Sequence, residues 1–599
     1  MKSAPSPLGG SAAQRGAFGV SRSFSGRRWS IADSDEDAVR AMAAEHGIPQ
    51  VLARILTVRG ISANDAAGYL NPTLKRLLPE PLTLKDMDRA VARVLAAIQG
   101  GERIAVFGDY DVDGSCSAAL LYEFLSAVAA PPRVYIPDRM TEGYGPNAPA
   151  LRRLKEEGAG LVITVDCGAG AYDALSAARE AGLDVIVLDH HAVEREPPAL
   201  AHVNPNQPGD TSGLGHVCAT GIVFLFLVAL NRALRGAGFY SGKTEPDLRD
   251  ALDLVGLATV CDVVPLVGVN RAFVQGGLAR LAKLERPGLA ALASVAGIAP
   301  PFTPYHLGFV LGPRINAGGR VGRCSLGVDL LTATDAASSE EFAAALDTHN
   351  RERQAIEKII LDEAIAKAAS QDNSPFLFLA GENWHPGVVG IVAGRLKERF
   401  AKPAFVAGFE GGLGRGSARS VAGVDIGAVI RAARDAGTLE AGGGHAMAAG
   451  FSLRPEQCDP FRAFLAAEFA KHPDVSALSA SLVVDAIVSP AGASASLAGD
   501  IARAGPFGAG NQEPLLAMPD VRVVFADTVG KDHVRLRLAG SDGARLDAIA
   551  FRIAETDLGR ALLGARGARI HVAGRLRAEE WNGRARVQLH LDDAAPAGV

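Results

Sequence analysis

Three acidic residues at every second position form the stretch of this sequence whose chemistry is easiest to interpret. The segment RIAVFGDYDVDG carries a short apolar run and then Asp109, Asp111 and Asp113. In extended backbone, a spacing of two places side chains on one face, and three carboxylates crowded there repel one another. Because a divalent cation would remove that repulsion, the motif predicts a metal site.

Two further apolar runs end in residue types that bind metals. LVITVDCG places Asp166 after its run, and DVIVLDHH places Asp189, His190 and His191 after its own. Open α/β sheets bind ligands at the carboxyl edge of their strands, so these three runs predict convergence at such an edge. Each acid alone would more simply be a strand-end or helix-cap residue, and the inference therefore depends on their combination.

One more acid, Asp262, lies among valines in LATVCDVVP and should be protonated or paired, with a metal or an arginine as partner. The combined donor set contains no cysteine, which favours Mg²⁺ or Mn²⁺ over Zn²⁺, and the histidine shifts the choice toward Mn²⁺. We expect two ions, because paired ions about 3.5–4 Å apart stabilise both the attacking and the leaving oxygen of a phosphoryl displacement. The pattern predicts hydrolysis of a phosphate ester or anhydride. The donor set is Asp109, Asp111, Asp113, Asp166, Asp262 and His190 or His191.

The chain between residues 101 and 265 contains the elements that would bring these residues together. Apolar runs that read as strands alternate there with amphipathic helical stretches, which predicts a mostly parallel sheet covered by helices. The strands are expected at 104–107, 133–136, 161–165 and 185–188, and the helices at 117–130 and 171–182.

At 599 residues the chain is too long for a single core. A long run without helix breakers, 336–370, predicts a helix that connects two α/β regions. From about residue 480 the pattern changes to five short alternating strands, which predicts a small barrel or sandwich. The expected organisation is 1–35 a disordered leader, 36–100 a helical extension, 101–295 the first α/β domain, 296–370 a helical connector, 371–475 a second α/β domain and 476–599 a β-barrel.

Composition narrows the class of protein. The six cysteines lie far apart without a C-x-x-C pair, which argues against a zinc ribbon or a disulfide framework and favours a reducing, cytoplasmic compartment. The longest apolar run, 217–230, is too short to span a bilayer and predicts a buried helix, so no membrane association is expected. A net charge of −5 gives no general attraction to nucleic acid. Residues 521–590, however, contain 13 Lys and Arg and 8 Asp and Glu, so this region is positively charged. The positive charge is compatible with binding of a single nucleic-acid strand and equally with a β-domain that is merely soluble.

Several glycines and arginines could bind a phosphate group through backbone amides or guanidinium groups. A triple glycine is by default a flexible turn and a single arginine a solvated residue, so their clustering is what favours a binding role. The candidates are Gly443, Gly444 and His445 in AGGGHAMAAGF, Ser417 and Arg419 in GRGSARS, Arg314, Asn316 and Arg320 in GPRINAGGR, and Arg139 with the base-stacking ring of Tyr144 in RMTEGYGPN.

The motifs DYDVDG, VDCG, DHH and CDVVP, in this order, resemble those of the DHH phosphoesterase superfamily. GPRINAGGR, GRGSARS and GGGHAMAAG are similar to motifs of its RecJ branch, and GPFGAGNQEP and WNGRARVQ resemble that branch's oligonucleotide-binding barrel. One departure is Ala-Gly-Gly in GPRINAGGR, where Ala-Ala-Gly is usual. The resemblance implies an α/β fold with a DHH-type parallel-sheet lobe, a DHH-associated second lobe, a helical connector between them and a C-terminal OB-like barrel.

The resemblance also implies a function: a single-strand-specific 5′→3′ DNA exonuclease of recombination and repair that uses Mn²⁺ or Mg²⁺ and releases 5′-mononucleotides. Single-stranded DNA, the single-strand DNA-binding protein and a repair helicase are the implied partners. It assigns catalysis to His191, Asp111 and Asp166, metal binding to Asp109, Asp111, Asp113, Asp166, His190 and Asp262, the 5′ phosphate to Ser417, Arg419 and Arg139, and base stacking to Tyr144.

Two other functions remain open from the sequence. A nanoRNA or cyclic-dinucleotide hydrolase could be built on the same two lobes, although a dinucleotide would need no additional barrel. A non-catalytic single-strand-binding scaffold is also possible, although the intact set of acids argues against loss of the metals.

Overall fold

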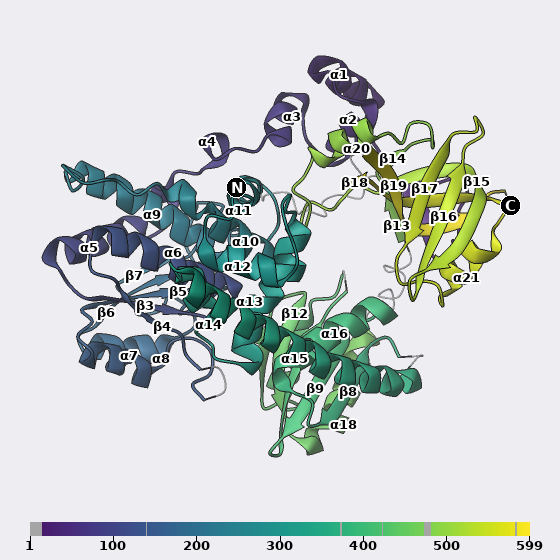
Figure 1. The fold of residues 1–599 in the computed structure, drawn as a ribbon. Coiled ribbons are helices and arrows are strands. Elements are labelled where there is room, and N and C mark those ends of the chain that lie inside the picture. Colours follow the sequence, from purple (N-terminus) through teal and green to yellow (C-terminus); the bar gives the residue numbers. More distant parts are fainter. Residues whose placement is uncertain are drawn as a thin grey trace. The chain divides into compact units, whose positions relative to one another are not determined.

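The computed structural model describes residues 15–138, 141–193, 195–371, 374–421, 423–471, 481–581 and 584–598. The chain divides into two compact units, which are described separately (Figure 1). Unit 1 comprises Met1–Leu70, Gln354–Gly505 and Glu513–Val599, and unit 2 comprises Asn71–Arg353 and Pro506–Gln512.

Unit 2 is built on a five-stranded sheet in which every neighbouring pair of strands is parallel. The sheet order is β4-β3-β5-β6-β7, and the four strands predicted from the sequence are confirmed, with β7 added at one edge. The strands are β3 (Ile104–Gly108), β4 (Arg133–Tyr135), β5 (Leu161–Val165), β6 (Asp184–Leu188) and β7 (Ala201–Val203). The central strands β3 and β5 are buried along their whole length because helices cover both faces.

Two apolar clusters lie on opposite faces of this sheet. The larger one packs against α5 (Met87–Gly100), α6 (Val112–Val128), α9 (Ala219–Gly236) and α10 (Leu252–Cys261), and the smaller one against α7 (Ala148–Glu156) and α8 (Tyr172–Glu180). Among the described residues, α9 is the one helix with the length and composition of a membrane span, and 72% of that window is buried inside the structure. It is therefore the core helix predicted for 217–230.

The remaining elements of unit 2 are helical. They are α4 (Leu74–Leu77), η1 (Pro81–Thr83), η2 (Leu248–Ala251), α11 (Val269–Leu281), α12 (Pro287–Val295), the π-helix η3 (His306–Leu311), α13 (Gly312–Val321) and α14 (Leu326–Thr332). The predicted connector is confirmed as α15 (Ala336–Ala368), a helix of 33 residues in which the boundary between the two units falls.

The second α/β domain, in unit 1, contains a five-stranded sheet of order β11-β12-β10-β9-β8. Its strands are β8 (Leu377–Glu382), β9 (Ala404–Glu410), β10 (Leu413–Arg419), β11 (Ala441–Gly444) and β12 (Ala448–Leu453). The end of α15 and α16 (Pro386–Phe400) pack on one face, and α17 (Ile426–Asp435) and α18 (Cys458–Phe469) pack on the other. The glycine run 442–444 is thus part of an edge strand and not a flexible turn.

The C-terminal region of unit 1 is a closed β-barrel, as the five alternating runs predicted. The strand β15 pairs with both β16 and β18, which closes the sheet on itself. The barrel strands are β15 (Leu516–Val529), β16 (His533–Ala539), β17 (Arg545–Ala550), β18 (Arg569–Trp581) and β19 (Arg584–Pro596). The short strand β14 (Ala486–Ile487) and the helices α20 (Ala495–Ala502) and α21 (Asp557–Gly564) complete this region.

The N-terminal segment differs from the disordered leader predicted for 1–35. Residues 15–31 contain β1 (Arg15–Gly16) and β2 (Arg28–Ile31), and β2 pairs in parallel with β13 (Ser481–Val484). Trp29 is fully buried, and its Nε1 donates to Asp593 Oδ2 at 2.9 Å. Burial of this ring compensates for a composition that otherwise resembles a disordered tail. The helical extension follows as α1 (Glu36–His46), α2 (Gln50–Val58) and α3 (Ala63–Leu70).

Candidate metal centre and phosphate-binding surface

The acids and histidines predicted to bind metals converge at the carboxyl edge of the β3–β7 sheet. Asp109 follows β3, Asp166 follows β5, the two histidines follow β6, and Asp262 is the C-cap of α10. Three groups have ligand atoms that all lie within 4.8 Å of one another. They are Asp109 with Asp111 and Asp166, Asp113 with His190 and Asp262, and Asp166 with His190 and His191.

The DYDVDG motif reaches this arrangement differently from the extended backbone that its spacing suggested. The strand β3 ends at Gly108, and Asp111 is already the N-cap of α6, where its side chain accepts from Gly114 N at 2.9 Å. Asp113 therefore lies in the first helical turn. Gly114 makes the turn possible, because a Cβ there would lie 2.5 Å from the carbonyl oxygen of Asp109.

Asp113 also holds the start of α9. Its carboxylate accepts from Ala219 N at 2.7 Å, from Thr220 N at 2.8 Å and from Thr220 Oγ1 at 2.6 Å. Both Thr220 donors use Oδ1, whereas Oδ2 accepts only from Ala219 among the described residues and lies 3.9 Å from His190 Nε2. A carboxylate oxygen can accept twice, so Oδ2 retains the capacity to bind a cation.

His190 lies between two acids and joins the groups into one site. Its Nε2 is 3.5 Å from Asp166 Oδ1 and 3.6 Å from Asp262 Oδ2. Burial lowers the pKa of His190, so the ring is neutral near physiological pH and presents a lone pair. The buried Oδ2 of Asp262 accepts no hydrogen bond within the described part of the chain. A cation bound beside His190 would provide a partner for both His190 Nε2 and Asp262 Oδ2.

The acids themselves are electrostatically unfavourable without a cation. Burial, followed by repulsion from Asp113 and the other acids, raises the pKa of Asp166 well above its usual range. The same causes raise the pKa of Asp111 and raise that of Asp262 to about 9. Buried oxygen donors that repel one another fit a hard divalent cation, which removes the repulsion and replaces the protons.

Asp189 and two asparagines hold the histidine pair, and the asparagines were not identified from the sequence. Asp189 Oδ1 is 2.7 Å from His191 Nδ1 and also accepts from the backbone N–H groups of both histidines. Asn204 and Asn206, just after β7, donate to the carbonyl oxygens of His191 and His190 at 2.9 and 2.6 Å. Asparagine is too common in turns for its type alone to have indicated this role.

The charge of His191 follows from this arrangement. Burial opposes protonation, but the hydrogen bond and charge of Asp189 prevail and raise the pKa of His191 to about 9. The same pairing lowers the pKa of Asp189 in spite of its burial. A charged imidazole at the rim of a cluster of acids can hold or donate a proton beside a phosphate oxygen.

Two candidate substrate residues contact the site. Tyr144 donates to Asp166 O at 3.1 Å, and its ring, 56% exposed, lies edge-on to His191 with centroids 6.1 Å apart. Asn316, on α13, accepts from Val112 N at 3.2 Å and so holds the turn between Asp111 and Asp113. The contact of Asn316 is with the protein backbone, which suits a positioning role.

The arginines predicted near this site differ from one another in environment. Arg314 forms an ion pair with the buried Asp347 at 2.9 Å and donates to Val310 O at 2.7 Å, so part of its guanidinium is committed within unit 2. Arg320 lies half-buried in the last turn of α13. Arg139 lies outside the described residues.

In unit 1, Ser417 and Arg419 lie on the same face of β10, against α16. A Cβ on Gly390 of α16 would lie 3.1 Å from Ser417 Oγ and 3.1 Å from Arg419 Nη2. Burial lowers the pKa of Arg419, yet its guanidinium forms no ion pair within the described part of the chain and donates only to Ala418 O. A desolvated guanidinium without an acid is costly, and an anion would compensate for it. Gly390 was not identified from the sequence because a glycine within a helix gives no such signal.

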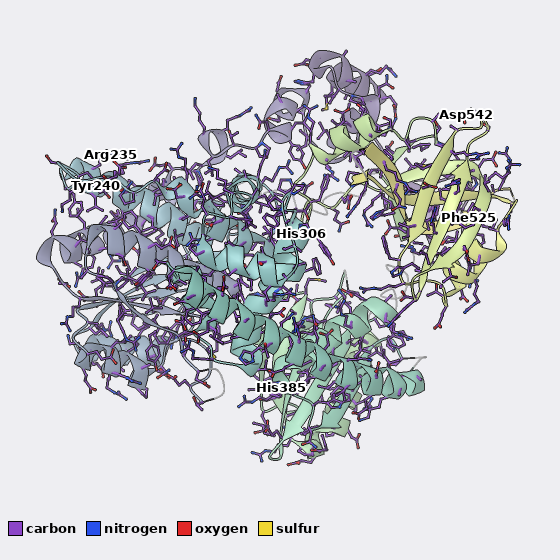
Figure 2. The ribbon with its side chains drawn as sticks, viewed as in Figure 1. Arg235, Tyr240, His306, His385, Phe525 and Asp542 are labelled. Carbon is purple, nitrogen blue, oxygen red and sulfur yellow. The ribbon has the colours of Figure 1, made fainter. Side chains whose placement is uncertain are left out.

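The sheet face beside Ser417 is bare backbone. Ser417 pairs across the sheet with Gly450 of β12, which pairs in turn with Gly443 of β11. A Cβ at either glycine would meet nothing within 4 Å. Gly444 has φ +149° and accepts from Arg431 at 2.9 Å, while His445 is exposed in the turn to β12. His385, labelled in Figure 2, is the N-cap of α16, and its side chain accepts from Gly387 N at 3.1 Å.

Comparison with known proteins matches three regions of the chain to family models. Residues 103–259 match the model of the DHH family, N-terminal domain, residues 373–471 match the DHHA1 domain, and residues 484–593 match the RecJ OB domain.

Whole-chain relatives agree with these domains. The chain is 34% identical to the single-stranded-DNA-specific exonuclease RecJ of Bacillus subtilis (strain 168), over 95% of this chain and 71% of that protein. It is also 34% identical to RecJ of Escherichia coli (strain K12), over 92% of this chain and 96% of that protein. The crystal structure of RecJ from Thermus thermophilus in complex with Mn²⁺ superimposes with a TM-score of 0.77 at 29% identity, over 94% of this chain and 79% of that one. The Mg²⁺ complex gives a TM-score of 0.74 at 28% identity, over 95% and 79%. The chain therefore belongs to the RecJ family.

Proposed function

We propose that this protein is a metal-dependent exonuclease that degrades single-stranded DNA from the 5′ end and releases 5′-mononucleotides. The observation that carries the proposal is the pair of ligand groups that meet at Asp166. One group is Asp109, Asp111 and Asp166, and the other is Asp113, His190 and Asp262. Because Asp166 Oδ1 lies only 3.5 Å from His190 Nε2, this carboxylate can serve both groups.

Mn²⁺ or Mg²⁺ is the proposed cofactor, with two ions as the expected count. The Thermus thermophilus RecJ structures contain Mn²⁺ and Mg²⁺, and the oxygen-rich donor set here suits the same ions. When bound, such ions supply a hydroxide near neutral pH and neutralise charge on the reacting phosphate. In this assignment Asp109, Asp111 and Asp166 would hold one ion, and Asp113, His190 and Asp262 would hold the other.

The chain's own groups would orient the phosphodiester. His191, charged through Asp189, would contact a non-bridging oxygen of the scissile phosphate. The exposed ring of Tyr144 lies beside His191 and offers a face on which a nucleobase can stack.

The 5′ phosphate would bind in unit 1 at Ser417 and Arg419. The buried guanidinium of Arg419 supplies the charge, and Gly390 supplies space that a side chain would fill. The bare backbone of Gly443 and Gly450 would let a nucleotide approach the sheet closely. Arg139 is proposed for phosphate binding on the resemblance alone, and Arg314, Arg320, Gly444 and His445 stay proposed for further phosphate contacts on their residue types and clustering.

The barrel would hold the single strand. Phe551 is 48% exposed between His533 and His590, with ring centroids 5.2 and 5.1 Å away, and Phe525 on β15 is 37% exposed (Figure 2). Several barrel arginines are already paired, since both Arg537 and Arg586 contact Asp547. In the barrel region, the exposed arginines that form no ion pair with any described residue are Arg522, Arg535, Arg545, Arg552 and Arg566. Aromatic and cationic side chains together suit stacking on bases and contact with phosphates.

We propose that the enzyme acts in DNA recombination and repair in the cytoplasm, with the single-strand DNA-binding protein and a repair helicase as partners; the resemblance to the RecJ branch supports this proposal. A dinucleotide hydrolase would not need the barrel, and a non-catalytic scaffold would not need the complete set of acids.

The test uses Asp166→Ala with 5′-labelled and 3′-labelled single strands. Metal participation is worth several kcal/mol, so we expect nuclease activity to fall by at least about a thousandfold, while strand binding measured by fluorescence anisotropy stays near that of the wild type. The wild type should release labelled mononucleotide at once from the 5′ label and only late from the 3′ label, and chelator should stop both. Turnover near wild type in the variant would refute the metal assignment, and early release from the 3′ label would reverse the polarity.

A further inference from the structure

The segment Pro506–Gln512 belongs by sequence to the C-terminal part of the chain, yet it groups with unit 2. It forms a tight loop in which Gly508 and Asn511 exchange backbone hydrogen bonds of 3.0 and 3.2 Å. Asn511 is 4% exposed, and its Nδ2 donates to Pro506 O at 2.8 Å. The loop therefore has a defined conformation in spite of its glycines. We refer to Pro506–Gln512 as the clasp loop.

The clasp loop lies directly on the residues that follow Asp262. Leu266 N donates to Ala509 O at 2.7 Å. Gly510 has φ +67°, and a Cβ there would lie 2.8 Å from the Cβ of Pro265 and 3.1 Å from its Cα. A Cβ on Gly508 would lie 2.8 Å from Leu266 Cδ1. Only glycine permits this approach of backbone to Pro265, and both glycines thus serve the same contact.

The turn that the clasp loop contacts is strained. Val263, next to Asp262, has φ +59°, a conformation that β-branched residues rarely adopt and that costs on the order of 1–3 kcal/mol. Its side chain is 69% exposed, so packing of the valine itself does not compensate for the strain. The turn must be held by its two ends. One end is the C-terminus of α10, and the other is Pro265–Leu266.

The second end is fixed from two sides. The buried Asn270 donates from Nδ2 to Pro265 O at 2.9 Å and to His216 O at 2.7 Å, and the clasp loop receives the N–H of Leu266. Without the clasp loop, Leu266 N–H would lose its acceptor Ala509 O, and the strained Val263 next to Asp262 could relax toward negative φ.

We propose that the clasp loop positions the metal ligand Asp262, so that cation affinity at the Asp113–His190–Asp262 group depends on residues of the C-terminal part of the chain. The inference rests on the proposed function, since it takes Asp262 as a ligand. Gly510 and Asn511 are then positioning residues. Outer contacts of this kind typically change metal affinity by about 10- to 100-fold when removed.

The experiment measures Mn²⁺ binding to the full-length protein without DNA, from the electron paramagnetic resonance signal of free Mn²⁺. The variants are Gly510→Ala, Asn511→Ala and Asp262→Asn. Gly297→Ala is the matched control, because Gly297 has the same φ of +67°, lies in the same unit and has nothing within 4 Å of its Cβ position.

We expect Gly510→Ala to lower the affinity for one of the two Mn²⁺ ions by about tenfold or more and to leave the affinity for the other unchanged. Asn511→Ala should lower the same affinity, and Gly297→Ala should bind Mn²⁺ as the wild type does. Nuclease activity of Gly510→Ala should recover as Mn²⁺ is raised. Isotherms of Gly510→Ala and Asn511→Ala that match that of Gly297→Ala would overturn the inference, and Asn511→Ala alone decides it if Gly510→Ala does not fold. If Asp262→Asn also binds two ions normally, the ligand assignment itself fails.

Discussion

At the scale of single residues, the metal centre is defined as much by groups that hold the acids as by the acids themselves. Thr220 and Ala219 occupy most of the Asp113 carboxylate, and Asn316 fixes the backbone just before it. Asp189 takes no place in the two proposed ligand groups but orients His191. These contacts reduce the freedom of each donor, so a cation would meet a site that is already arranged.

The raised pKa values of the acids predict how metal binding depends on pH. Without metal, the folded protein keeps protons on Asp166 and Asp262 that the unfolded chain has lost above about pH 4. Stability of the metal-free protein therefore falls as the pH rises above about 4, up to about 9 for Asp262, by at most about 1.4 kcal/mol per pH unit for each such group. Because bound metal replaces these protons, the stabilisation by Mg²⁺ should grow over the same range.

Thermal unfolding with Mg²⁺ and with chelator checks this prediction. The difference between the two melting temperatures should be larger at about pH 8 than at about pH 6. Asp262→Asn removes one titrating group and should make the metal-free protein less sensitive to pH. A difference that is constant or shrinks with rising pH would show that the acids are already ionised in the metal-free protein.

The convergence of the candidate ligand residues was easier to predict from the sequence than the backbone conformation that carries them. Few residue types bind hard cations, and each candidate followed an apolar run, so its place at the sheet edge could be inferred. The spacing of Asp109, Asp111 and Asp113 is compatible both with a strand and with a strand that ends and turns into a helix, and the second occurs here. Asn204 and Asn206 could not be found, because their role depends on a strand, β7, that the sequence did not reveal.

At the scale of secondary-structure elements, the strands β3, β5 and β6 were predictable because they are continuous runs of apolar and β-branched residues. The glycine strand β11 was not, since glycine disfavours strands and usually marks a turn. It is held by pairing with β12 and by hydrogen bonds from Arg431 and Arg434 to its carbonyl groups. The result is a sheet edge without side chains beside Ser417.

The face of β10 that carries Ser417 and Arg419 leads to a prediction about the 5′ end. Arg419→Ala removes the buried cation, and a hydrogen bond to a charged group is worth about 1.5–3 kcal/mol. The preference for a 5′-phosphorylated over a 5′-hydroxyl strand should thus fall roughly 10- to 100-fold. Competition between the two strands measures it directly.

Arg415→Ala is the control, because Arg415 lies two residues before Ser417 on the same strand but is exposed. It should keep the preference. Gly390→Ala should lower the preference as Arg419→Ala does, since its methyl group would contact both Ser417 and Arg419. An unchanged preference in Arg419→Ala would place the 5′ phosphate elsewhere.

At the scale of the whole molecule, contacts between distant parts of the chain were beyond the sequence. The parallel pairing of β2 with β13 and the return of the clasp loop to unit 2 leave no local pattern. Because of these contacts, a truncation that removes residues 480–599 would affect more than the barrel. It would also remove the clasp loop and expose Trp29. Point substitutions such as Phe551→Ala are therefore a cleaner way to examine the barrel.

Trp29 provides the test of the N-terminal segment. Trp29→Ala should destabilise the barrel by about 3–5 kcal/mol, the usual cost of removing a fully buried tryptophan. In thermal unfolding, Trp29→Ala should show a transition at a lower temperature. The control is Arg28→Ala, because Arg28 is exposed on the same strand, and this variant should unfold as the wild type does. Equal transitions in the two variants would mean that the segment does not contribute to the barrel's stability.

The hydrogen bond between Trp29 and Asp593 joins residues 564 positions apart. At ribosomal rates of about 5–20 residues per second, Trp29 emerges roughly 30 to 110 seconds before its acceptor exists. During translation the Trp29 indole therefore stays without its final hydrogen-bond acceptor until the last strand is made. A tag or a deletion within the first thirty residues should therefore affect the last step of folding.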